Sequence, residues 1–131
     1  MSPDLKYLLF SVVLAFVQVL IAAMAAQVQV GLPALAGNRD ELPNLTGLAG
    51  RARRAHFNMV ENLVLFAALV LIAAVAGKAN ATTALGAAIF FWGRLAHAII
   101  YLIGIPWLRT LAWFVSVIGM AMIAWVLLQA M

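Results

Sequence analysis

The chain has 131 residues, of which 67% are hydrophobic and only 9% are charged. A soluble domain carries about a quarter charged residues, so this composition argues against a soluble fold and indicates a membrane protein. The net charge of +4 comes from basic residues that mostly lie beside apolar segments, which argues against nucleic acid as a partner, and the absence of cysteine excludes disulfides and thiolate chemistry of the chain itself.

Four segments are long and apolar enough to span a bilayer as helices, because a hydrocarbon core of about 30 Å requires roughly 20 residues. They are residues 7–30, 54–76, 81–103 and 107–129. The first is too long for the apolar region of a signal peptide, which has roughly 7 to 15 residues. We therefore predict an all-α integral membrane four-helix bundle that forms one domain over residues 1–131.

The connections between these helices differ in length and composition. Residues 31–50 are rich in Gly and Pro and carry charges, which predicts a true loop. Residues 77–80 and 104–106 are tight turns, and Pro106 stands where the start of a helix tolerates proline. Such short turns make the helices that they join antiparallel neighbours.

The basic residues predict how the chain is oriented in the membrane. One side holds five arginines and the other holds two lysines: Arg39, Arg51, Arg53, Arg54 and Arg109 against Lys6 and Lys78. Positive residues favour the cytoplasmic side. We therefore expect the first loop and the last turn in the cytoplasm and both termini on the opposite side of a membrane such as the bacterial inner membrane.

The second predicted helix opens with an unusually polar segment, RARRAHFNMVEN at residues 51–62. At about 100° per residue, five polar side chains fall within an arc of roughly 100°, whereas Arg53 and His56 point elsewhere. The five are Arg51, Arg54, Asn58, Glu61 and Asn62. Glu61 lies about 15 Å deeper than Arg51, where an ionised carboxylate that faces lipid is very costly, so it must face protein, water or a ligand.

The third predicted helix carries Arg94, His97 and Tyr101, whose spacings of three and four place them on one face. Arg94 lies roughly 14 Å below the cytoplasmic end of this helix, close to the depth of Glu61, which predicts a Glu61–Arg94 ion pair. Tyr101 and Arg109 lie nearer to the surface. The cluster therefore widens into a basic vestibule, which suits an anionic ligand.

Simpler interpretations of these residues stay open. Arg51 and Arg53 can each be interfacial anchors whose guanidinium groups reach the headgroups. A Glu61–Arg94 pair can simply lock two helices together. The whole cluster is harder to explain by packing, because polar groups converge from two helices at graded depth. The tryptophans are assigned to the interface or to packing, and no metal site is expected because neither histidine has further ligands at a suitable spacing.

Residues 53–62, RRAHFNMVEN, resemble the signature Arg-Arg-Ala-His-x-Asn-x-x-Glu-Asn of the microsomal glutathione transferase-like bacterial branch of the MAPEG superfamily, the membrane-associated proteins in eicosanoid and glutathione metabolism. Residues 94–109 resemble the same branch, with Arg, His three later, Tyr four after that, and Arg after a Pro-containing turn. The resemblance implies a homotrimer of four-helix subunits, with glutathione bound between neighbouring subunits near the cytoplasmic face.

The resemblance also implies roles for individual residues. The positions that match glutathione-binding residues of the family are Arg53, Arg54, His56, Asn58, Glu61, His97 and Tyr101. Arg109 matches the catalytic arginine credited with stabilising the glutathione thiolate, which is chemically sensible because a nearby cation lowers the pKa of a thiol. The family commonly supplies another arginine from the end of its first helix, where this chain has Gln27-Val28-Gln29 and the nearest arginine is Arg39.

The implied function is that of a glutathione transferase or peroxidase. Glutathione is the co-substrate, and the partner is a lipophilic electrophile that arrives from the lipid bilayer. Two alternatives remain: a non-catalytic binding or scaffold protein of the same superfamily, and a small multidrug transporter that uses Glu61 as its proton-coupled carboxylate. The predicted pair with Arg94 argues against the transporter.

Overall fold

In the computed structural model, which describes residues 1–131, all of the regular secondary structure is α-helical. The helices are α1 Pro3–Val30, α2 Leu32–Ala36, α3 Gly47–Val75, α4 Ala81–Ile103 and α5 Pro106–Gln129. The 4 long helices have the length and composition to cross a membrane, which confirms the predicted fold class. α1 begins at Pro3, before the predicted Tyr7, because Ser2 caps its first turn by accepting a hydrogen bond from a backbone N–H.

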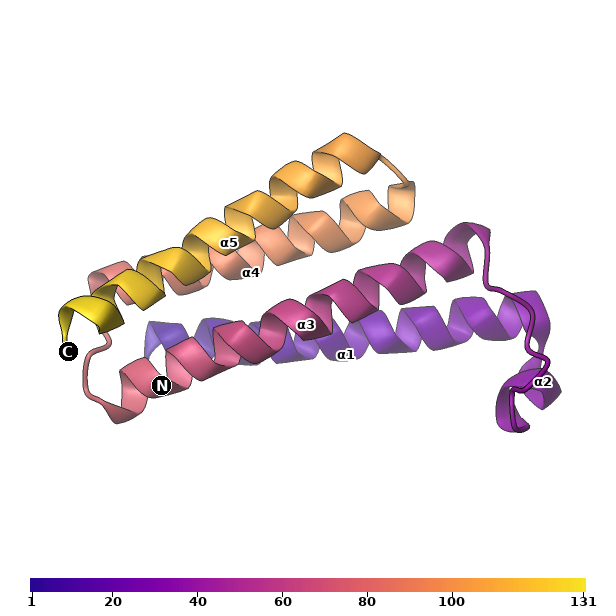
Figure 1. The fold of residues 1–131 in the computed structure, drawn as a ribbon, viewed down its shortest axis with the longest axis horizontal. Helices are drawn as coiled ribbons and strands as arrows, with labels where there is room; N and C mark the ends of the chain where they lie inside the picture. Colours follow the sequence, from indigo (N-terminus) through magenta and orange to yellow (C-terminus); the bar gives the residue numbers. More distant parts are fainter.

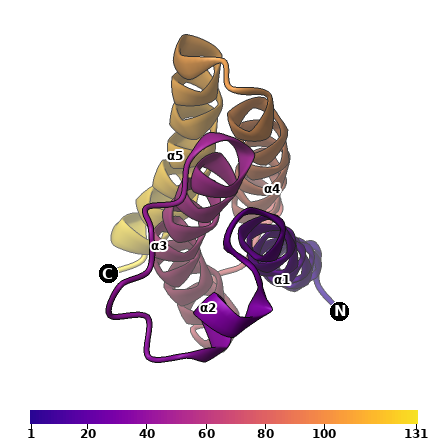
Figure 2. The ribbon, with the colours of Figure 1, turned by 90° about the vertical axis from the view of Figure 1, so that its right-hand side faces the viewer.

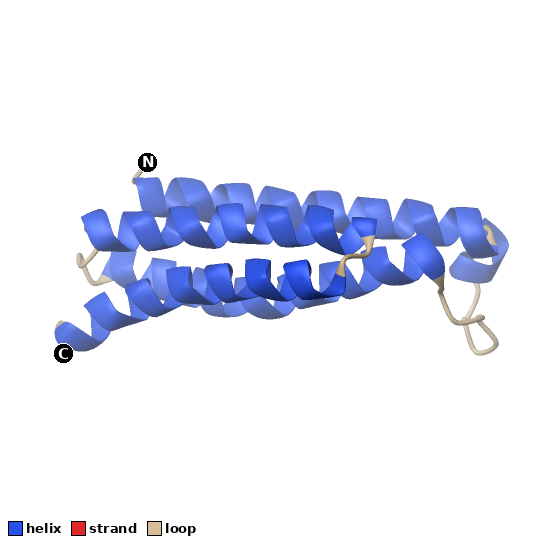
Figure 3. Cartoon of the chain, turned by 90° about the horizontal axis from the view of Figure 1, so that it is seen from above, coloured by secondary structure: helices blue, strands red, loops and turns tan.

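The long helices run side by side along one axis (Figure 1). α4 packs most extensively against α5, and α1 packs most extensively against α3. Seen end on, α3 and α4 lie between α1 and α5, which do not touch (Figure 2). Both termini and the α3–α4 turn lie at one end, named here the terminal end, and α2 and the α4–α5 turn lie at the other, the α2 end. The irregular backbone lies at the terminal end, around α2, and in the α4–α5 turn, which is set back from α2 (Figure 3).

Both predicted turns are confirmed. Asn80 and Thr83 form a reciprocal capping box at the start of α4, in which each side chain bonds the other residue's backbone N–H. Gly104 ends α4 with a left-handed backbone, φ 90°, which glycine adopts without steric cost, and Pro106 opens α5. These local signals fix α3, α4 and α5 as antiparallel neighbours.

The loop predicted at residues 31–50 is only partly correct. Its first part contains α2, and α3 begins at Gly47, well before the predicted Arg54. The arginines interrupt the apolar run, yet the helix continues through them because arginine is a good helix former. Gln29 holds this junction, since it donates to Thr46 Oγ1 over 3.0 Å and accepts from the Thr46 backbone N–H over 3.1 Å.

The interior toward the terminal end is tightly packed and apolar. The rings of Phe66 in α3 and Phe90 in α4 stack with their centres 3.8 Å apart. α4 and α5 approach so closely that a Cβ added to Gly86 would lie 2.6 Å from the carbonyl oxygen of Gly119. Small residues that let backbones approach are typical of helix contacts in lipid.

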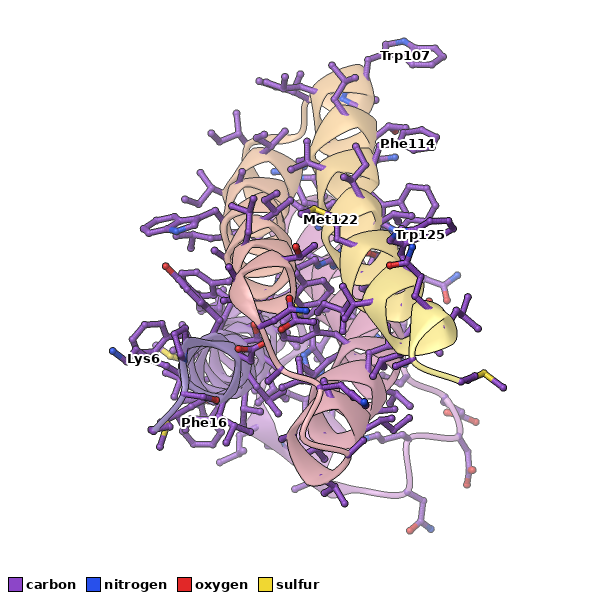
Figure 4. The ribbon with its side chains drawn as sticks, turned by 90° about the vertical axis from the view of Figure 1, so that its left-hand side faces the viewer. Lys6, Phe16, Trp107, Phe114, Met122 and Trp125 are labelled. Atoms are coloured by element: carbon purple, nitrogen blue, oxygen red, sulfur yellow. The ribbon has the colours of Figure 1, made fainter.

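The outside of the bundle is as apolar as its interior. Phe16, Trp107, Phe114 and Trp125 project away from the helices into the surroundings (Figure 4), and each is more than half exposed. A soluble protein does not cover its surface with large apolar side chains in this way. The surface therefore agrees with helices that face lipid.

Candidate functional site

The predicted site residues lie toward the α2 end of the bundle. Arg51 joins two helices there, because its Nε donates to the carbonyl oxygen of Leu102 over 3.1 Å. This bond satisfies one of the carbonyl groups that the end of α4 leaves free. Arg51 therefore connects the start of α3 to the end of α4.

Four predicted residues line one cleft of about 320 Å³ between α3, α4 and α5, and Thr110 and Trp113 complete its wall; the four are Asn58, His97, Tyr101 and Arg109. The guanidinium carbon of Arg109 lies 4.4 Å from the centre of the Tyr101 ring. The rings of Tyr101 and His97 meet edge to face with their centres 5.4 Å apart. Small-molecule sites have volumes of about 300 to 1,000 Å³, so the cleft fits a small ligand and offers it a cation, a phenol, an imidazole and an amide.

Arg53 and His56 do not line this cleft. They lie on another side of α3, in a groove of about 340 Å³ against α1. Nδ1 of His56 is buried without a hydrogen-bond partner, and the Arg53 guanidinium carbon lies 5.1 Å from the centre of the Phe57 ring. Apolar residues of α1 form the opposite wall: Val19, Ala22, Ala23 and Ala26. One chain thus presents the predicted ligand-binding residues on two sides of α3.

Arg54 and Glu61 are exposed on the outer surface of α3. Their spacing of seven residues places them on one side of the helix, adjacent to the side on which Asn58 lines the cleft. A membrane-length helix therefore carries a carboxylate and a guanidinium group on a surface that no other part of the chain covers.

The predicted Glu61–Arg94 ion pair is wrong for the chain as folded. Nη2 of Arg94 donates to Asn58 Oδ1 over 2.8 Å, and its Nε and Nη1 have no hydrogen-bond partner. The prediction compared the depths of the two residues along their helices but not the directions in which their side chains point. Around the axis of α3, Glu61 lies about 100° from the buried Asn62 and faces outward. Asn58 lies only about 40° from Asn62 and faces α4.

Sequence reasoning missed three lining residues. Trp113 follows Arg109 by one helical turn and Thr110 is its direct neighbour, so the periodicity of α5 alone places both beside the cleft. Arg39 lines the groove with Arg53 and His56. Its only signal was a positive charge in a Gly- and Pro-rich segment, because no periodicity links that segment to α3.

A larger cavity of about 540 Å³ lies at the same end, between α1 and the start of α3. Its walls are nearly all apolar, with Ile21, Met24 and Val28 from α1 facing Leu48 and Ala49 from α3. Such a cavity suits a lipophilic molecule.

A model of the MAPEG family matches residues 7–129, nearly the whole chain. No curated protein matches the chain. The family match and the 4 membrane-length helices together identify an integral, multi-pass membrane protein. At the level of the family, they support a function in glutathione-related or eicosanoid metabolism.

Proposed function

The chain belongs to the MAPEG family, and we propose that it is a glutathione-dependent membrane enzyme, a transferase or peroxidase that acts on lipophilic electrophiles. The observation that carries this proposal is the cleft, where Asn58, His97, Tyr101 and Arg109 meet at one end of a membrane-length bundle. Glutathione carries two carboxylates and a thiol, so it needs cations and hydrogen-bond donors, and these side chains supply both.

Arg109 is the proposed catalytic residue. It is half-buried, and its guanidinium group lies over the Tyr101 ring, an arrangement that restricts its position. A cation held beside a thiol lowers the pKa of that thiol and raises the population of the nucleophilic thiolate. In the transferase reaction the thiolate sulfur forms a bond to the electrophilic carbon as the leaving group departs.

The glutathione site is proposed to be shared between subunits of a homotrimer. Asn58, His97, Tyr101 and Arg109 lie in the cleft, but Arg53 and His56 lie in the groove against α1, so the two sets line different pockets within one chain. The groove of a neighbouring subunit supplies the second set. Arg39 lies in that groove and is included in the set as a further cation.

The exposed face of α3 supports the same assembly. An ionised carboxylate that faces lipid is costly, and Glu61 lies on an uncovered surface of a membrane-length helix beside Arg54. A neighbouring subunit that packs on this face removes the exposure to lipid. Both residues then border the ligand-binding cleft, in agreement with the roles that the resemblance implies for them.

A second candidate is a non-catalytic protein that binds a lipophilic molecule. The large apolar cavity at the α2 end favours it, because that cavity needs no thiol chemistry to explain it. In the enzyme, the same cavity receives the electrophile from the bilayer. The two functions differ in whether the chain activates a thiol.

Ultraviolet difference spectroscopy separates these functions. Glutathione added to the purified protein in detergent is expected to give the absorbance of a thiolate at neutral pH. The signal should be lost in Arg109→Ala, while bound glutathione remains measurable by calorimetry. Absence of the thiolate signal at saturating glutathione would contradict the enzymatic proposal and leave the binding protein.

Subunit complementation tests the shared site. Arg53→Ala removes a groove residue and Arg109→Ala removes a cleft residue, so each variant alone should lose most activity. In mixed trimers, an intact groove from one subunit meets an intact cleft from another, and activity should partly return. If the mixture is no more active than the two variants measured separately, the site lies within one subunit.

A further inference from the structure

Arg94 is a buried cation without an acidic partner. Only 1% of its surface is exposed, and its one hydrogen bond is to the neutral side chain of Asn58. Nε and Nη1 are buried with no partner. An apolar side chain of similar volume fills such a space at lower cost, so packing alone does not explain a guanidinium group here.

The contact fixes which way the amide of Asn58 is turned. A guanidinium group donates and never accepts, so the Asn58 atom that faces Arg94 must be the carbonyl oxygen. Asn62 reinforces this orientation, because its Nδ2 donates to the Asn58 backbone oxygen over 2.8 Å and lies 3.5 Å from the same Oδ1. A reversed amide would place N–H groups against both neighbours.

The Nδ2 group of Asn58 is therefore the part of the amide that is left for a ligand. It has no hydrogen-bond partner in the chain and, unlike the two free nitrogens of Arg94, it is not sealed from solvent. Asn58 lines the cleft together with Tyr101 and Arg109. The Asn58 amide therefore offers the cleft its N–H donors, because its carbonyl oxygen is engaged by Arg94.

We propose that Arg94 is a positioning residue of the glutathione site, which acts through Asn58 by presenting the Nδ2 donors to a carboxylate or carbonyl oxygen of the ligand. This inference rests on the proposed function. A hydrogen bond from a cation also polarises the amide and makes Nδ2 a stronger donor. The same orientation disfavours a ligand that places an amino group there, since two donors then face each other.

The first test separates the loss of the Asn58 Nδ2 donor from a loss of folding stability. Asn58→Asp keeps an oxygen for Arg94 and turns the contact into an ion pair, but it has no donor for the ligand. The melting temperature should be unchanged or higher. The Kd for glutathione, measured by calorimetry on the full chain in nanodiscs, should rise roughly 10- to 100-fold, as for loss of a hydrogen bond to a charged group. Unchanged affinity would overturn the inference.

The second test asks whether Arg94 acts through Asn58. Arg94→Met keeps the volume and removes the donor, and it should raise the Kd roughly three- to tenfold without lowering the melting temperature, whereas Arg94→Lys should recover part of the affinity. In the Asn58→Ala background, Arg94→Met should have no further effect on the Kd. Additive effects would show that Arg94 does not act through Asn58.

Gln18→Met is the matched control, because Gln18 is also buried with an unpartnered side-chain oxygen but does not line the cleft. Its Kd should equal that of the wild type. If the control weakens binding as much as Arg94→Met, the effect is general and the inference is overturned. Wild-type protein that fails to bind glutathione overturns the proposed function and the inference together, whereas binding that Arg94→Met leaves intact overturns the inference alone.

Discussion

The two halves of the bundle are built from the same helices but differ in how completely their polar groups are satisfied. Toward the terminal end, Phe66 stacks on Phe90, Gly86 packs on Gly119, and the Asn80 capping box closes on itself. Toward the α2 end, Arg94, His97 and His56 each keep a buried nitrogen without a partner. The terminal end keeps one such atom, Asp4 Oδ1, so most of the unpartnered groups lie toward the α2 end.

This difference assigns folding stability mainly to the packed half and ligand binding mainly to the polar half. Buried polar groups are nearly always hydrogen bonded in folded proteins, so a cluster of unpartnered ones indicates a missing ligand or subunit. Both proposed partners, glutathione and a neighbouring chain, approach the α2 end. Substitutions in the packed half should therefore change folding, and substitutions in the polar half should change binding and turnover.

The largest effect is expected from Gly86→Val in the packed half. A Cβ at this position would lie 2.6 Å from the Gly119 carbonyl oxygen, which is backbone and cannot move aside. Valine should cost at least the roughly 1 to 3 kcal/mol of an overpacked core and separate α4 from α5. The measurement is thermal unfolding in detergent together with the yield of monodisperse protein.

Gly37→Val is the matched control, since Gly37 has φ −74° and an added Cβ there would make only an ordinary 3.5 Å contact with the Pro33 carbonyl oxygen. It should leave the melting temperature nearly unchanged. A Gly86→Val protein as stable as this control would contradict the division between the two halves, because the packed half would then tolerate expansion.

A large effect on turnover alone is expected from Arg109→Ala in the polar half. Removal of one charged group that stabilises a developing or ionised centre typically lowers kcat by roughly 100- to 1,000-fold. The Kd for glutathione should change far less, because other donors remain. Without the cation the thiol loses its proton only at higher pH, so the pH dependence of turnover should also shift upward. Equal losses in kcat and in binding would contradict the catalytic role.

The helices were easier to predict from the sequence than the polar site. Hydropathy gave four spans, and Gly104, Pro106 and Asn80 marked their ends, because these signals act locally along the chain. The predicted start of α3 at residue 54 is too late, because the polar residues before it interrupt the apolar run without ending the helix. Local signals therefore locate membrane helices better than they locate helix ends at the headgroups.

The site was predicted as a set of residues but not as an arrangement. Helical periodicity and the family resemblance both indicated Asn58, His97, Tyr101 and Arg109, which the structure brings into one cleft. The predicted Glu61–Arg94 pair rests on depth alone, but Arg94 points toward Asn58 and Glu61 faces outward, so the pair does not form within the chain. Helical periodicity separates Arg53 and His56 from the other polar residues of α3, but the groove that they form with α1 depends on how the two helices pack, which no local pattern contains.

The smallest effect is expected from Arg39→Asn, which tests whether the groove contributes to glutathione binding. Arg39 is exposed, has a left-handed backbone with φ 65°, and its Nε donates to the Leu35 carbonyl oxygen over 2.7 Å. Asparagine tolerates this backbone better than most residues, so the substitution removes the charge with little strain. An exposed charge contributes little, and the Kd for glutathione should rise about two- to fivefold at low salt and converge on the wild-type value at high salt.

Asp40→Asn is the control, because it changes the adjacent exposed residue and removes a negative charge instead of a positive one. It should not weaken glutathione binding. If Arg39→Asn binds glutathione like the wild type at low salt, the groove cation does not reach the ligand, and the shared site must rest on Arg53 and His56.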